Sequence, residues 1–158
     1  MLVGDIPATA AHRAPDVVAV QFHDRAITYA QLRDRCWQLS NALLAIAAPG
    51  DRIAILAENC PAYALCYYGV PGAGMALTFL NYRLSPPELA YIIGNAAPTV
   101  LIVEDKFMGA IDAIRDQLGV HTIVTIGQPS PGTLAFDALL ASGEATPPNV
   151  RVADDDLA

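Results

Sequence analysis

Positive charge is scarce in this chain of 158 residues. Nine Lys and Arg stand against 16 Asp and Glu, which gives a formal net charge of −7 at pH 7. The basic residues are also scattered singly along the sequence. Binding to nucleic acid or to an anionic membrane surface requires clustered Lys and Arg. We therefore expect no nucleic acid partner.

Charged residues of either sign are few, at 16%, whereas apolar residues make up 54% of the chain. An average soluble domain carries about 25% charged residues. The excess of apolar side chains indicates either a large core or apolar surface that is covered by a partner. A homo-oligomer formed through such a surface is one expectation.

Cysteine is also rare, and the three residues Cys36, Cys60 and Cys66 have neither an even number nor the spacing of a metal site. We expect buried free thiols in a reducing cytoplasm. The N-terminus places Asp5 and Pro7 where a signal peptide needs a basic start and an apolar run. The sequence therefore predicts a cytoplasmic location.

One long stretch lacks charge altogether, between Glu58 and Arg83. A membrane-spanning helix needs about 20 apolar residues, so the length alone would suffice. Prolines and glycines interrupt the stretch, and they are Pro61, Gly69, Pro71, Gly72 and Gly74. A buried helix, a turn and a buried strand are favoured over a membrane span.

Motifs of self-contained catalysis are missing. The sequence has no Gly-x-Ser-x-Gly elbow and no Gly-x-x-x-x-Gly-Lys-Ser/Thr loop. Gly69, Gly72 and Gly74 follow a helix and precede a strand, which favours turn and close-packing roles over phosphate binding. We expect no catalytic and no metal-binding residue in this chain.

The histidines and the neighbouring carboxylates have structural explanations. His12 falls in an irregular segment, His23 in a turn, and His121 at the amino end of a strand. The pair at 104–105 suits a helix N-terminus, and the run at 154–156 suits a solvated linker. These structural interpretations of the histidines and carboxylates are favoured over acid–base or metal-binding roles.

Short apolar runs alternate with helical patterns through the rest of the chain. We expect a hairpin over 17–28, then helices over 30–46, 61–69, 86–96, 107–118 and 134–141, and strands over 52–57, 75–79, 99–103 and 121–126. The later strands are continuous apolar runs, which is typical of strands covered on both faces. The expected fold is α/β, with a parallel sheet, helices on both faces and a small N-terminal hairpin.

Three parts are expected along the chain. Residues 1–16 form an irregular N-terminal segment, 17–141 an α/β subdomain, and 142–158 a linker. The linker assignment rests on its Gly, Pro and acidic residues and on the lack of apolar periodicity.

Ligands of open α/β sheets usually bind at the carboxyl ends of the strands. The loops expected there carry three carboxylates but only two cations, Arg83 and Lys106, so they make a poor phosphate site unaided. Arg83 is the one plausible anion contact, because a guanidinium offers planar, bidentate hydrogen bonds. The alternative role for Arg83 is a salt bridge at the surface or between domains.

The segment 81–89, Asn-Tyr-Arg-Leu-Ser-Pro-Pro-Glu-Leu, is the most informative of the chain. Ser85, Pro86 and Glu88 specify a helix start with a capping box. The segment resembles the Asn-x-Arg-Leu-(Ser/Thr)-Pro-x-Glu-Leu pattern of the AMP-forming acyl-CoA synthetase (acyl-activating, adenylate-forming) family. Similar family motifs occur in order from about Val17 onward, at 27–32, 50–55, 59–61, 72–76, 98–103 and 155–158. Pro71 and Thr78-Phe79 depart from the pattern and predict a loosened helix end and loosened strand pairing.

The resemblance implies a parent reaction in which a carboxylic or fatty acid and ATP give an acyl-adenylate, from which coenzyme A displaces AMP. ATP, Mg²⁺ and coenzyme A are implied for the full-length enzyme. The family's Tyr-Thr-Ser-Gly-Thr-Thr-Gly loop and later catalytic lysine are not in this sequence. The resemblance therefore implies an N-terminal fragment that binds no cofactor by itself and is inactive alone. In some members of the family the arginine that matches Arg83 lies near the path of coenzyme A, which implies the same role for Arg83.

Two other classes stay open. A free-standing, non-catalytic α/β interaction module would explain the length and the high apolar content. A receiver-like signalling domain fits the alternation of strands and helices, but the acidic pair and the lysine that such a domain needs are not at the expected strand ends.

Overall fold

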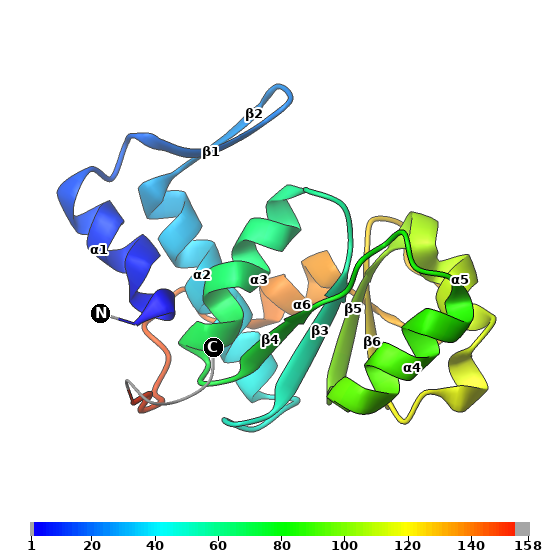
Figure 1. Cartoon of the computed structure of the whole chain (residues 1–158). Coiled ribbons are helices and arrows are strands. Elements are labelled where there is room, and N and C mark those ends of the chain that lie inside the picture. Colours follow the sequence, from blue (N-terminus) through cyan, green and yellow to red (C-terminus); the bar gives the residue numbers. More distant parts are fainter. Residues whose placement is uncertain (1, 154–158) are drawn as a thin grey trace.

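A parallel sheet of five strands forms the centre of the molecule (Figure 1). The structure is a computed structural model and describes residues 2–153. The strand order is β4-β3-β5-β6-β7, with β3 at Arg52–Leu56, β4 at Ala76–Phe79, β5 at Val100–Glu104, β6 at Thr122–Ile126 and β7 at Leu134–Ala135. Every neighbouring pair in this sheet is parallel.

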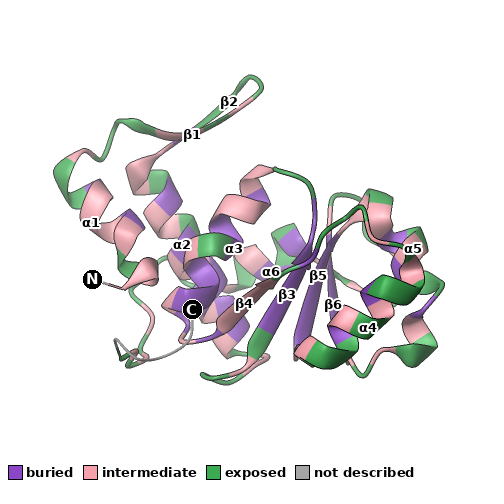
Figure 2. Cartoon of the chain, viewed as in Figure 1, coloured by how far each residue is buried: buried purple, intermediate pink, exposed green. Residues whose placement is uncertain are grey.

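Helices cover both faces of the sheet (Figure 1). Apolar residues of α2 (Tyr29–Leu44), α3 (Pro61–Gly72) and α6 (Phe136–Ser142) pack on one face. Residues of α4 (Pro86–Ala96) and α5 (Met108–Asp112) pack on the other. Strands β3 and β5 are buried almost throughout because both of their faces are covered (Figure 2). The expected fold class is confirmed.

The N-terminal hairpin is confirmed as well. Strands β1 (Val18–Phe22) and β2 (Arg25–Thr28) pair antiparallel, and His23 lies in their turn with a φ of 52°. Thr28 caps α2, because its hydroxyl accepts a hydrogen bond from the Gln31 amide at 3.3 Å.

The expectation of irregular structure over residues 1–16 is wrong. This segment contains a short 3-10 turn, Val3–Asp5, and the helix α1, Ile6–Arg13. Pro7 fits the first helical turn, and Pro7 and Ala11 are buried one helical turn apart, against α2. A helix forms because small side chains allow this close packing, although they give little apolar periodicity in the sequence.

Helix α3 extends further than expected, through Pro71 to Gly72. Pro71 lies in the last turn, and the helix ends one residue after it. Gly69, which precedes Pro71, serves close packing as expected, because a Cβ at this position would lie 3.0 Å from Leu39 of α2. Gly74 then turns the chain into β4 with a φ of +70°.

Two expected helices take other forms. The pattern at 107–118 splits into a 3-10 turn (Asp105–Phe107), α5 and a second 3-10 turn (Arg115–Gln117), because Ile114 leaves helical backbone geometry between the last two. The helix expected from Leu134 instead begins at Phe136. The two residues before it satisfy their backbone groups by pairing with β6.

The C-terminal segment folds back over α2. The side-chain amide of Asn41 donates to the carbonyl oxygens of Glu144 and Thr146 at 2.8 and 2.9 Å. The predicted acidic run at 154–156 and the motif at 155–158 lie outside the described residues. Across residues 2–153, none of the helices combines the length and the apolar character that crossing a membrane would require.

Candidate functional site at the carboxyl edge of the sheet

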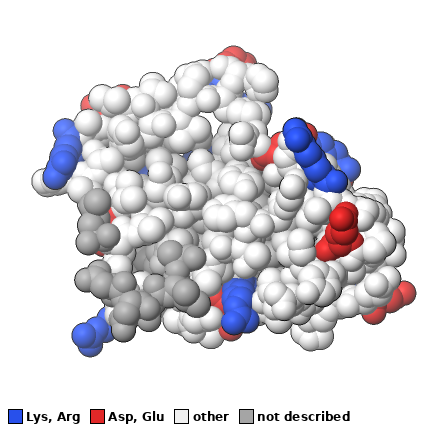
Figure 3. Space-filling model, viewed as in Figure 1, with Lys and Arg blue, Asp and Glu red and all other residues white. Residues whose placement is uncertain are grey.

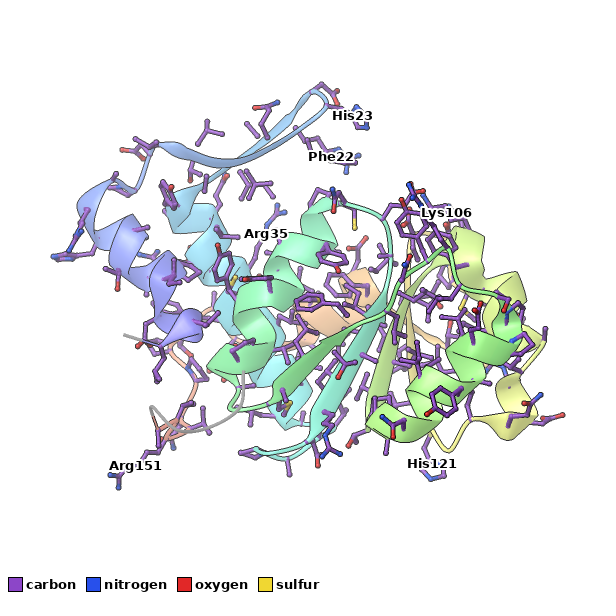
Figure 4. All side chains as sticks on the ribbon, in the orientation of Figure 1. Phe22, His23, Arg35, Lys106, His121 and Arg151 are labelled. Carbon is purple, nitrogen blue, oxygen red and sulfur yellow. The ribbon has the colours of Figure 1, made fainter. Side chains whose placement is uncertain are left out.

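The loops after β3, β4, β5 and β6 meet at one edge of the sheet, because all four strands run in the same direction. Lys106 marks this edge in Figure 4, whereas His121 lies at the opposite, amino edge as expected. The topology therefore brings together the loop residues that the sequence singled out as candidates.

Lys106 is held by two carboxylates. Its Nζ lies 2.5 Å from Oε2 of Glu58 and 3.0 Å from Oε1 of Glu104. The second oxygen of Glu104 accepts a hydrogen bond from the Glu58 amide at 2.8 Å. The hydrogen bonds to Glu58 and then to Glu104 raise the pKa of Lys106. The charge of this lysine is therefore paired with two carboxylates, which competes with binding of a phosphate.

The third carboxylate of the edge orders a turn. Oδ2 of Asp105 accepts a hydrogen bond from the Gln128 amide at 2.8 Å. Gly127, just before Gln128, has a φ of +93°, and a Cβ at this glycine would overlap the Asp105 carboxylate. Only glycine satisfies both the backbone angle and this close approach.

Arg83 lies beside these ion pairs without joining them. Its amide donates to Oδ1 of Asn81 at 3.0 Å, and its Cζ lies 5.7 Å from the ring centre of Tyr82. Tyr82 in turn stacks on Phe107 at 5.5 Å. Within the described part of the chain no carboxylate forms an ion pair with Arg83. Its guanidinium therefore stays exposed and available, and its role in ligand binding stays a prediction.

The predicted capping box at the start of α4 is present. Oε2 of Glu88 accepts hydrogen bonds from the amide of Ser85 at 2.8 Å and from its hydroxyl at 2.6 Å. These hydrogen bonds lower the pKa of Glu88. The cap fixes the end of the loop that carries Arg83.

A hollow of about 280 Å³ opens beside this loop. It is lined by Ala57, Asn59, Tyr63, Phe79, Leu80, Asn81 and Tyr82. Sequence reasoning missed the aromatic contribution of Tyr63 and Phe79. The available signals were the place of Phe79 at a strand end and the aromatic side chains at positions 63 and 67, one turn apart on a helix.

The cysteines behave mostly as expected, because Cys36 and Cys66 are buried free thiols. Burial raises the pKa of Cys36 to about 12 and also raises that of Cys66. Such thiols are poor nucleophiles. Cys60 is only half-buried, which corrects the expectation of three buried thiols. His12 lies on α1 and not in an irregular segment.

Comparisons with known proteins agree with one another. The model of the family described as AMP-binding enzyme matches residues 7–158. An indoleacetate–CoA ligase of Aromatoleum aromaticum is 34% identical over 140 residues, which is 87% of this chain and 28% of that protein. A long-chain-fatty-acid–CoA ligase of Thermus thermophilus is 37% identical over 128 residues, which is 79% of this chain and 23% of that protein.

Solved structures extend the agreement to the fold. The anthranilate CoA ligase AuaEII, solved with anthranoyl-AMP, matches 99% of this chain and 30% of its own with a TM-score of 0.90 and 26% identity. A Mycobacterium tuberculosis fatty acyl CoA synthetase matches 98% of this chain and 31% of its own with a TM-score of 0.87 and 28% identity. This chain thus spans less than a third of the length of the relatives described here. From its motifs, its fold and these matches, the chain belongs to the AMP-forming acyl-CoA synthetase family of AMP-binding enzymes.

Proposed function

We propose that this chain is the N-terminal part of an ATP-dependent acyl- or aryl-CoA ligase and is inactive alone. The observation that carries the proposal is the family match over residues 7–158 together with CoA ligases that are 34% and 37% identical to this chain. In the parent reaction, a carboxylic acid attacks ATP to give an acyl-adenylate and pyrophosphate. Coenzyme A then displaces AMP and forms the thioester.

The residues of the carboxyl edge suit only part of this chemistry. Its three carboxylates are occupied, since Glu58 and Glu104 hold Lys106 and Asp105 accepts from an amide. They offer no free set of oxygen ligands for Mg²⁺. Lys106, with its charge paired, does not suit the phosphates of ATP either. The sites for ATP and Mg²⁺ are therefore assigned to the remainder of a longer enzyme.

Arg83 is the residue whose surroundings suit a coenzyme A phosphate. Its guanidinium has no ion pair within residues 2–153, and the Asn81 turn and the Tyr82 ring hold the base of the loop. A guanidinium binds phosphate through two parallel hydrogen bonds. In this role Arg83 would bind and orient coenzyme A without taking part in bond making.

A chimera tests the proposed function. Residues 1–158 replace the matching N-terminal segment of the A. aromaticum indoleacetate–CoA ligase, and thioester formation is measured with indoleacetate, ATP and coenzyme A. We expect a folded chimera to form the thioester. A chimera that unfolds cooperatively but forms neither adenylate nor thioester would count against the proposal.

The same chimera tests Arg83. Arg83→Ala should raise the KM for coenzyme A about tenfold, because a charge-assisted hydrogen bond contributes about 1.5 kcal/mol or more. The rate of adenylate formation should not change. Arg25→Ala, on the exposed hairpin, serves as the matched loss of one positive charge. An unchanged KM in the Arg83→Ala chimera would remove this residue from the coenzyme A site.

A second candidate function, a free-standing interaction module, is favoured by one observation. Tyr67 and Phe79 are about half exposed, at 48% and 46%, and their rings lie side by side. Exposed aromatic side chains of this kind are typical of protein interfaces.

A further inference from the structure

Lys106 is the only lysine in the sequence, and the fold places it at the carboxyl edge of the sheet (Figure 4). Two carboxylates approach its ammonium group, that of Glu58 at 2.5 Å and that of Glu104 at 3.0 Å. We call these three side chains the Lys106 triad. Figure 3 shows basic and acidic side chains close together at the upper right, where Figure 4 labels Lys106. With one positive and two negative charges, the triad repels anions although it contains a lysine.

The two carboxylates of the triad have different surroundings. The side chain of Glu104 is 19% exposed, and its second oxygen accepts a hydrogen bond from the Glu58 amide at 2.8 Å. Glu104 therefore joins the loop after β3 to the end of β5. The side chain of Glu58 is 49% exposed, and within residues 2–153 its carboxylate has Lys106 as its one partner. The Glu58 carboxylate thus acts on the charge of Lys106 and on no other described group.

An aromatic pair connects the triad to Arg83. The Nζ of Lys106 lies 5.3 Å from the ring centre of Phe107, which stacks on Tyr82 at 5.5 Å. The Cζ of Arg83 lies 5.7 Å from the ring centre of Tyr82. An ammonium group has more N–H donors than the single oxygen of Glu104 occupies. Without the charge of Glu58, Lys106 would therefore offer a second cationic donor at the edge that carries Arg83.

We infer that Glu58 is a specificity-determining residue of the carboxyl edge, which keeps Lys106 from binding phosphate ligands and leaves Arg83 as the cation that contacts them. This inference rests on the proposed CoA ligase function. In that reaction pyrophosphate forms before coenzyme A displaces AMP. Two available cations would retain pyrophosphate, a small and highly charged anion, in competition with coenzyme A. The negative triad disfavours pyrophosphate, whereas coenzyme A also binds through its uncharged parts.

Glu58→Gln separates this role from a purely structural one. The glutamine side chain keeps an oxygen that accepts a hydrogen bond from Lys106, and the backbone amide at position 58 still donates to Glu104. The substitution therefore removes the charge of Glu58 and preserves its contacts. If Glu58 only ties two loops together, the variant binds anions as the wild type does or more weakly. If Glu58 withholds Lys106, the variant binds them more tightly.

Titration of the 158-residue chain with inorganic pyrophosphate at constant ionic strength tests the inference, with NMR detection of the single lysine side chain. Glu58→Gln should bind pyrophosphate at least about tenfold more tightly than the wild type. The lysine signal should move in the variant and stay in place in the wild type. Asp112→Asn removes a carboxylate that pairs with Arg115 on the surface at 2.8 Å, and this control should give no gain. Equal affinities of wild type and Glu58→Gln, or a gain with an unmoved lysine signal, would overturn the inference.

Inhibition of the chimera by pyrophosphate separates this inference from the proposed function. Glu58→Gln should lower the constant for inhibition by pyrophosphate against coenzyme A about tenfold. If Arg83→Ala raises the KM for coenzyme A but Glu58→Gln leaves the inhibition unchanged, only the role of Glu58 is overturned. If Arg83→Ala leaves that KM unchanged, the proposed coenzyme A contact is overturned instead. The titration of the 158-residue chain decides the role of Glu58 even if the chimera does not fold.

Discussion

Close approaches of single residues hold the carboxyl edge together. At Gly127 the requirement is twofold, since the backbone has a φ of +93° and the Asp105 carboxylate lies where a Cβ would be. The same carboxylate accepts the hydrogen bond of the Gln128 amide. The geometry of the loop after β6 therefore depends on the absence of one side chain.

Gly127→Ala should lower the free energy of unfolding by about 1–3 kcal/mol, because the variant strains the backbone and displaces Asp105. Urea unfolding followed by circular dichroism measures the change. The matched control is Gly94→Ala on α4, where an added Cβ meets open space. Because alanine has a higher helix propensity than glycine, this variant should raise the free energy of unfolding by about 1 kcal/mol. Equal effects of the two substitutions would contradict the account of the edge.

The sequence predicted residues with local signals and missed those without them. Ser85 and Glu88 were predictable because a capping box is complete within four residues. The pairing of Lys106 with Glu58 joins residues 48 apart in the chain, so it depends on the order of the strands. Phe79 and Tyr63 were missed for the same reason, because their contact forms only after α3 crosses back over the sheet.

At the scale of elements, most boundaries followed from local chemistry. Continuous apolar runs correctly predicted β3, β5 and β6. Helix α4 begins and ends at the residues that its capping box and apolar pattern predicted. Helix α1 was missed because its small side chains give no apolar period, and its stability comes from packing on α2. The two residues of β7 were assigned to a helix because only pairing with β6 makes them a strand.

The start of α4 should depend on pH through Glu88. Hydrogen bonds from Ser85 lower the folded-state pKa of Glu88, so its contribution to stability is present above the ordinary value of 4.5 and is lost as the pH falls through the folded value. The difference in Tm between wild type and Glu88→Gln should therefore shrink as the solution is acidified below pH 4.5.

Thermal unfolding at neutral and acidic pH measures this difference in Tm. As a control, the same Glu88→Gln substitution is measured in a chain that also carries Ser85→Ala. Removing the hydroxyl takes away one of the two hydrogen bonds to Glu88. The pH dependence of the Glu88→Gln effect should then be smaller. A difference in Tm that stays constant across the acidic range would refute the role of the ionised cap.

For the whole molecule, the described residues 2–153 form an α/β layer whose carboxyl edge leaves Arg83 as the candidate ligand contact. The sheet and its helices were predictable from the alternation of apolar runs with helical patterns, and the family from the order of the motifs. Residues 7–158 match the family model. The carboxyl edge pairs its own cations and carboxylates, apart from Arg83. The position of β4 at one end of the described sheet was not predictable, because strand order is set by packing of the crossover helices and not by any single segment.

The most direct test of the account is the release of pyrophosphate by the 158-residue chain incubated with ATP, Mg²⁺ and a panel of fatty and aromatic carboxylic acids. The account predicts no release above that of a control without protein, because the edge that this chain supplies has no unpaired cation other than Arg83 and no free carboxylate set for Mg²⁺ within residues 2–153. Acid-dependent release of pyrophosphate would contradict it.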